Sequence, residues 1–138
     1  MNKKQLIVGW VMGITLILNG CVSMGLERMP DSYYLNQLKE IKKSNEITLQ
    51  KPYADIFNAV INVFRDLNIN ILKKDYEGKV VFGAYYAEGC YTVYGVFFEE
   101  DGRDKTKIIV KSNGAWFSDD FVFNKIKEEI ELQKKLNE

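Results

Sequence analysis

The most regular pattern of hydrophobic and polar positions lies between Pro52 and Asn68. Within it, seven apolar residues are spaced so that all fall on one face of an α-helix: Tyr53, Ile56, Phe57, Val60, Ile61, Phe64 and Leu67. Proline is tolerated in a first helical turn, and asparagine accepts the left-handed backbone that ends many helices. The pattern therefore predicts a helix between Pro52 and Asn68 with one buried face.

Alternating and β-branched segments predict strands elsewhere in the chain. We expect them over 47–49, 69–74, 79–86, 91–99 and 105–112. The short segment 87–90 joins the third and fourth as a hairpin. The last strand places Thr106, Ile108 and Val110 on one face and lysines on the other. Gly83 and Gly95 lie within strands, where glycine is costly unless it permits a bend or a close approach.

A second helix is expected near the C-terminus. Ser118 can cap it, and Asp119 and Asp120 in its first turn oppose the helix dipole. Its buried stripe is expected to be Val122, Phe123, Ile126 and Ile130.

The resulting element order is β-α-β-β-β-β-α. It predicts an α+β fold, a two-layer antiparallel sheet with helices on one face. Over roughly residues 46–136 this order resembles the helix-grip, or TATA-binding-protein-like, topology of BamC-type envelope lipoproteins. The resemblance lies in element order alone, so it implies an envelope binding module and transfers no functional residues.

The N-terminal residues have the pattern of a secretory signal. Residues 1–4, which are basic through Lys3 and Lys4, precede an uncharged apolar stretch, residues 6–18. This stretch is too short to span a bilayer as an isolated helix. The ending Leu18-Asn19-Gly20-Cys21 resembles the lipobox of bacterial lipoproteins. In that family the signal is cut before the cysteine, whose sulfur and new α-amine are acylated. The alternative is an uncleaved helix through Leu26, which Asn19 and the charge at Glu27 disfavour.

The lipobox resemblance also implies an address and a division of the chain. Residue 22 is valine and not aspartate, which by resemblance to enterobacterial sorting implies the periplasmic face of the outer membrane. We expect a signal peptide at 1–20, a lipidated tether at 21–45 and a binding domain at 46–138. A short helix could start in the tether at Asp31, with Tyr34, Leu38 and Ile41 on one side.

Composition narrows the function classes. Basic and acidic residues number nineteen each, which disfavours nucleic acid as a partner, and the absence of histidine removes most acid–base and zinc chemistry. The acidic turn 99–104 lacks the ligand spacing of a calcium loop, and the adjacent Asp119 and Asp120 do not face each other on a helix. We therefore expect no enzyme, no catalytic residues, no metal and no cofactor. Cys90, the second thiol, could pair with another chain or be buried near a turn.

Aromatic residues on the central hairpin are the candidate contact residues. Only one face of the sheet can pack on the helices, so the rest must meet solvent, a partner or another part of the chain, such as the N-terminal segment. We name Tyr85, Tyr94, Phe97 and Trp116 as candidates for a partner or ligand surface. The function expected is a protein-binding or scaffold module of an outer-membrane lipoprotein. The alternative is a periplasmic carrier or sensor of a hydrophobic or lipid ligand between the sheet and the C-terminal helix.

Overall fold

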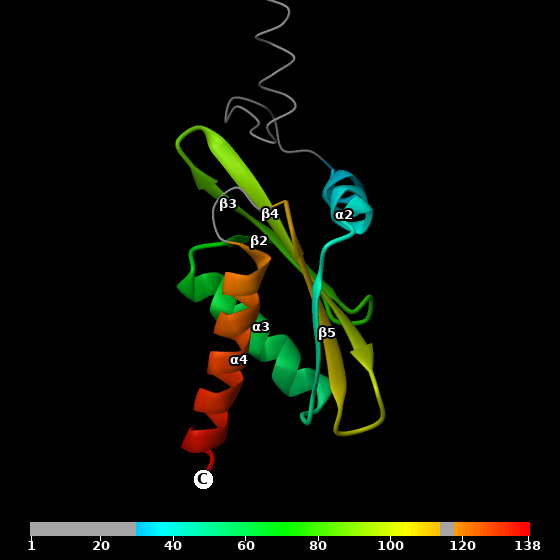
Figure 1. Cartoon of the computed structure of the whole chain (residues 1–138), viewed down its shortest axis with the longest axis vertical. Helices are drawn as coiled ribbons and strands as arrows, with labels where there is room; N and C mark the ends of the chain where they lie inside the picture. Colours follow the sequence, from blue (N-terminus) through cyan, green and yellow to red (C-terminus); the bar gives the residue numbers. More distant parts are fainter. Residues whose placement is uncertain (1–29, 114–117) are drawn as a thin grey trace, which may run out of the picture.

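The computed structural model describes residues 30–113 and 118–138, apart from the side chain of Cys90 (Figure 1). The elements are α2 (Asp31–Glu40), β1 (Asn45–Leu49), α3 (Tyr53–Asp66), β2 (Asn70–Asp75), β3 (Val80–Ala87), β4 (Cys90–Glu100), β5 (Thr106–Ser112) and α4 (Asp119–Leu136). Every expected strand and both expected helices are present. The signal segment and Trp116 lie outside the described residues.

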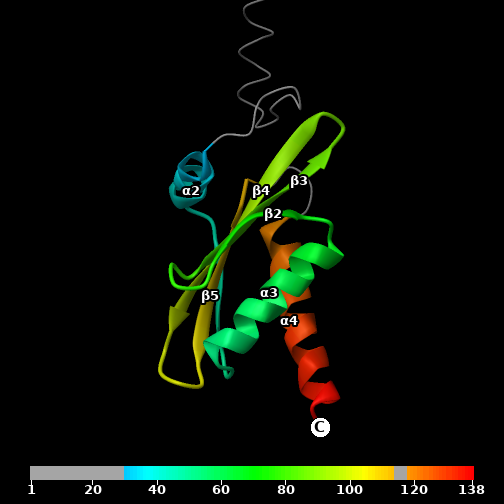
Figure 2. The same ribbon diagram turned by 180° about the vertical axis from the view of Figure 1, so that it is seen from behind.

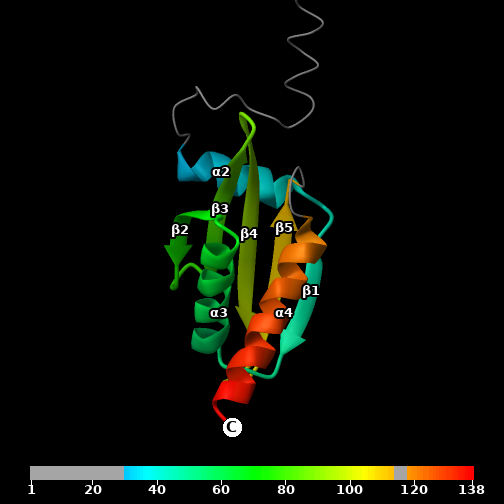
Figure 3. The same cartoon turned by 90° about the vertical axis from the view of Figure 1, so that its left-hand side faces the viewer.

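The five strands form one antiparallel sheet in the order β1-β5-β4-β3-β2. Helices α3 and α4 lie side by side on one face of this sheet (Figure 3). The predicted α+β class, with an antiparallel sheet and two helices packed on it, is therefore confirmed.

Helix α3 buries the face that its sequence predicts. Six of the seven expected residues are buried, Leu67 is half-buried, and Ala59 and Val63 are buried as well. Asn68 follows the helix with φ +57°, the left-handed conformation expected of it. This turn lets the chain enter β2 at the edge of the sheet.

Helix α4 begins at the expected cap. The Ser118 Oγ atom accepts a hydrogen bond from the Phe121 backbone N–H at 3.1 Å. Val122, Ile126 and Ile130 are buried against the sheet and α3, while Phe123 is only partly buried. The predicted stripe is thus confirmed.

Helix α2 lies on the opposite face of the sheet from α3 and α4 (Figures 1 and 2). Tyr34 and Leu38 are buried against it, and Ile41 packs at the margin. The segment 31–40 is therefore part of the folded unit, whereas we expected a tether with a short helix. The helix packs here because the central strands are apolar on both faces, and the second face needs a cover.

The sheet separates two clusters of buried side chains. The larger fills the space between the sheet, α3 and α4, and the smaller lies under α2. The smaller cluster consists of Tyr34, Leu38, Val80, Phe82, Ala84, Tyr91 and Val93. Helix α2 covers only the part of this face nearest the β3–β4 turn, and the remainder of the face lies beyond it (Figure 1).

Two opposite ends of the molecule are important for the site. The start of α2, the β3–β4 turn and the start of α4 lie at one end, which we call the proximal end (Figures 1 and 2). The β4–β5 turn and the C-terminus of α4 lie at the other, the distal end. The sequence places none of these segments beside another, so the arrangement results from the sheet topology.

Candidate functional site

Tyr94 was expected on a contact surface, and the structure corrects this expectation. Its side chain has 0% relative exposure and belongs to the core between the sheet, α3 and α4. Successive strand residues point to opposite faces, and residue 94 points to the face that both helices cover. Tyr94 therefore contributes no outer surface in the folded domain.

Tyr85 and Phe97 are both half-buried but lie on opposite faces of the sheet. Tyr85 packs against the larger core, and Phe97 packs at the margin of the cluster under α2. The Lys111 Nζ atom lies 5.8 Å from the centre of the Phe97 ring, within range of a cation–π contact. The two candidates therefore do not form one common surface.

A projecting hairpin arm is the most distinctive feature of the proximal end. We use this name for residues 85–92, where β3 and β4 extend past their neighbours. The last β2–β3 pair is Asn70 with Ala84, and the last β4–β5 pair is Tyr94 with Ser112. Three β3–β4 pairs continue beyond these points, so no other described strand flanks the arm.

The arm closes in a two-residue turn. Glu88 and Gly89 have φ values of +51° and +79°, as the first and second positions of a type I′ turn require. This turn matches the right-handed twist of the strands, although glutamate at its first position is strained. The arm is thus a regular hairpin with one unfavourable residue at its tip.

Tyrosines join the arm to α2. Tyr91 lies edge-on to Tyr34, with ring centres 6.1 Å apart, and 5.9 Å from its cross-strand partner Tyr86. Tyr33 packs edge-on against Tyr34 at 5.7 Å, and its hydroxyl accepts a hydrogen bond from Gln37 Nε2 at 3.0 Å. We call Tyr33, Tyr34, Tyr86 and Tyr91 the tyrosine cluster. It fixes the arm on the side where α2 begins.

Burial controls the ionisation of Tyr91. It raises the Tyr91 pKa to about 12, assisted by repulsion from neighbouring tyrosinates and by a hydrogen bond with Tyr33. The hydroxyl therefore stays protonated at neutral pH. Tyr91 therefore contributes packing and hydrogen bonding to the tyrosine cluster and is not a proton donor or acceptor matched to pH 7.

Close packing seats α2 on the sheet. A Cβ atom at Gly95 would lie 2.6 Å from Leu38 Cδ1, so only glycine leaves room for the buried leucine. At Gly83 the same atom would lie 2.6 Å from the backbone oxygen of Asn70 on the neighbouring strand. Both glycines therefore permit a close approach, one of the two roles expected of glycine within a strand.

Asp119 and Asp120 organise the start of α4 through Asn45. The Asn45 Nδ2 atom donates to Asp119 Oδ2 at 2.9 Å and to Asp120 Oδ1 at 2.7 Å. The Lys43 ammonium lies 4.0 Å from the Asp119 carboxylate, which is largely buried. These contacts tie β1 to α4, which gives both aspartates a structural role.

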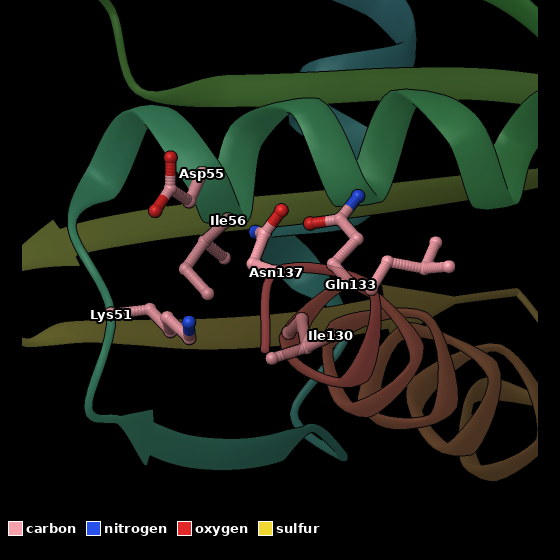
Figure 4. Close-up of a pocket in the computed structure, with 7 residues that line it drawn as sticks. Lys51, Asp55, Ile56, Ile130, Gln133 and Asn137 are labelled. Carbon is pink, nitrogen blue, oxygen red and sulfur yellow. The ribbon is translucent and has the colours of Figure 1, made fainter.

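A pocket lies between the start of α3 and the end of α4 at the distal end (Figure 4). Its volume is about 270 Å³, and it is lined by Lys51, Asp55, Ile56, Ile130, Gln133, Leu136 and Asn137. Small-molecule sites are commonly about 300–1,000 Å³ and predominantly apolar. This small pocket of mixed polarity does not resemble one.

The space between the sheet and α4 is filled by side chains. Tyr94, Ile108 and Ile126 are fully buried there and pack together with valines from β4, β5 and α4. Cores packed in this way leave few voids larger than a water molecule. The described residues thus provide no support for a ligand held between sheet and helix.

Residues 30–113 and 118–138 contain neither a metal-binding group of side chains nor a membrane-spanning helix. Within these ranges, no three histidine, cysteine, aspartate or glutamate side chains are grouped so as to bind a metal ion. No helix there combines the length and apolar composition needed to cross a bilayer.

No family model matches the chain, and no curated protein matches it either. The function must therefore be argued from the residues and their arrangement.

Proposed function

We propose that the protein is a small non-enzymatic lipoprotein, anchored through acylated Cys21 to the periplasmic face of the outer membrane. Its α+β domain would act there as a protein-binding or scaffold module for another envelope component. The observation that carries the proposal is the segment Leu18-Asn19-Gly20-Cys21 directly after a basic and then an apolar stretch.

The position of α2 is compatible with such an anchor. Residues 22–30, nine in number, separate Cys21 from the first residue of α2. They could span at most about 30 Å when fully extended. An anchored domain would therefore remain close to the bilayer, with its proximal end nearest the attachment point.

The proposal of a binding module rests on the uncovered part of the second sheet face. Phe97, Ile109 and Lys111 lie half-buried on this face, and Phe97 packs at the margin of the cluster under α2. The Lys107 ammonium bridges Glu46 at 3.3 Å and Glu99 at 3.8 Å, so the surface presents apolar groups among paired charges. Such a mixture suits a protein partner better than a nucleic acid.

Incorporation of labelled palmitate into the full chain tests the anchor. The unaltered chain and Cys90→Ala should both take up label, whereas Cys21→Ala should take up none. Density-gradient separation of the two membranes should place the labelled chain in the outer-membrane fraction. Label retained by Cys21→Ala would show that the lipoprotein proposal is wrong.

Chemical cross-linking of the chain to its neighbours, followed by recovery of the cross-linked proteins, tests whether the domain binds a protein partner. Phe97→Glu places a charge on the uncovered face and should reduce the recovery of a specific partner. Phe121→Glu, on the exposed surface of α4 (Phe121 40% exposed), is the matched control and should leave recovery unchanged. Equal recovery with both variants would exclude the second sheet face as the binding surface.

A further inference from the structure

We infer that the hairpin arm rests on the phospholipid surface, with Tyr86 in contact with the headgroup layer. This inference rests on the proposed acylation of Cys21 and adds the orientation of the domain on the membrane. It assigns a second, non-covalent membrane contact to residues outside the anchor.

The arm and the first residue of α2 belong to the same end of the molecule. The chain enters α2 at the proximal end, where the tip of the arm also lies (Figures 1 and 2). The nine residues after Cys21 limit the distance of this end from the bilayer to about 30 Å. The C-terminus of α4 lies at the opposite, distal end (Figures 1 and 2).

The composition of the arm suits the interface between water and lipid. From Val80 to Phe98 the sequence contains a single charged residue, Glu88, which lies in the turn. Tyr86 is 42% exposed although its ring packs against Tyr91. Tyrosine concentrates at headgroup level because its ring is apolar and its hydroxyl stays hydrated.

The charge at the tip of the arm sets the depth of this contact. Glu88 lies in the turn and is exposed, and a carboxylate is costly to place in the hydrocarbon region. The Tyr86 hydroxyl likewise favours the hydrated interface. The arm therefore lies in the hydrated headgroup layer, where Glu88 remains solvated.

The test uses the full acylated chain in vesicles of phosphatidylethanolamine and phosphatidylglycerol that contain a lipid with a nitroxide on its headgroup. In a Cys90→Ala background, a fluorescent probe is attached after Tyr86→Cys or, as the control, after Tyr76→Cys. Tyr76 is 45% exposed and lies in the β2–β3 turn, at the opposite end of β3 from the arm. The two probes thus have closely matched exposure but different predicted distances from the bilayer.

The nitroxide lipid should quench the probe at residue 86 at least about twofold more than the probe at residue 76. Circular dichroism must show that both variants fold. If the Tyr86→Cys variant does not fold, the probe is attached after Glu88→Cys instead. Equal quenching in chains that carry palmitate would overturn the orientation and leave the lipoprotein proposal standing. That result is also expected if the arm binds a protein instead. Absence of palmitate from the unaltered chain would overturn both proposals.

Discussion

Leu38 of α2 lies directly over Gly95 of β4, so closely that a Cβ atom at residue 95 would come within 2.6 Å of the leucine Cδ1. The leucine has no exposed surface and cannot move aside without disturbing the cluster under α2. This close approach helps to hold the N-terminal helix on the second face of the sheet.

Gly95→Ala should therefore loosen α2. We expect a loss of about 1–3 kcal/mol in the free energy of unfolding, because the added methyl overpacks a full site. Leu38→Ala should cost about 2–5 kcal/mol through the cavity that it leaves. Urea unfolding gives these values, and amide exchange in α2 reports the local effect.

The double variant separates this contact from a general effect of alanine in the strand. In the Leu38→Ala background, Gly95→Ala should cost nothing or should stabilise, since the methyl then fills vacated space. An equal loss in both backgrounds would show that the two residues do not interact.

The turn at the tip of the arm can be improved. Glu88→Asn should raise the free energy of unfolding by about 0.5–1 kcal/mol, because Asn-Gly is preferred in type I′ turns and asparagine tolerates positive φ. Gly89→Ala should lower it by about 1–2 kcal/mol, because φ at this position is +79°. Thermal unfolding measures both changes, and a destabilising Glu88→Asn would contradict the type I′ assignment.

Asn45 should be essential for the joint between β1 and α4. Asn45→Ala removes donors to two carboxylates and should cost about 1–3 kcal/mol. Asn45→Asp should cost more, because it places a third carboxylate beside Asp119 and Asp120, and added salt should recover part of the loss. Asn58→Asp, on the exposed surface of α3, introduces the same charge and should have little effect. Denaturant unfolding at low and high salt distinguishes these cases.

Two buried tyrosines should make the domain sensitive to alkali. Burial is the largest cause that raises the pKa of Tyr53 and that of Tyr91 to about 12, from an ordinary value of 10.0. The unfolded chain therefore loses these protons at lower pH than the folded chain does. Stability should be unaffected below about pH 9 and should fall as the pH rises from about 10 to 12.

Tyr33→Phe provides the specific test of the tyrosine cluster. It removes the hydrogen bond and the tyrosinate repulsion that Tyr33 supplies, so the pKa of Tyr91 should fall towards 10 while that of Tyr53 stays unchanged. Tyrosinate absorbance, followed during titration, measures both groups. An unchanged Tyr91 titration would mean that Tyr33 does not influence it.

The sequence alone was sufficient for features that depend on neighbours along the chain. The spacing of apolar residues located α3, Asn68 marked its end, and Ser118 marked the start of α4. Residues 79–99 were expected to form a hairpin and do so. Periodicity, caps and turns are local properties, so one sequence contains enough information to predict them.

Tertiary structure decided which aromatic residues meet solvent. Tyr94 and Phe97 belong to the same strand, yet one is fully buried under two helices and the other lies half-buried beside α2. Alternation separates them onto opposite faces but does not say what covers each face. The cover of the second face comes from α2, whose own pattern has only two buried residues and is weak.

The projection of the hairpin arm also follows only from the three-dimensional arrangement. The same is true of the position of the arm and α2 at one end of the molecule. The arm projects because β2 and β5 end their pairing at Asn70 and Ser112, a matter of register between strands distant in sequence. By itself, the sequence determined the local elements and predicted a lipid anchor at Cys21, which remains a proposal. Long-range packing alone decided which end of the domain carries the tyrosine cluster. The reason is that the contact of Leu38 with Gly95 places α2 on the second face of the sheet.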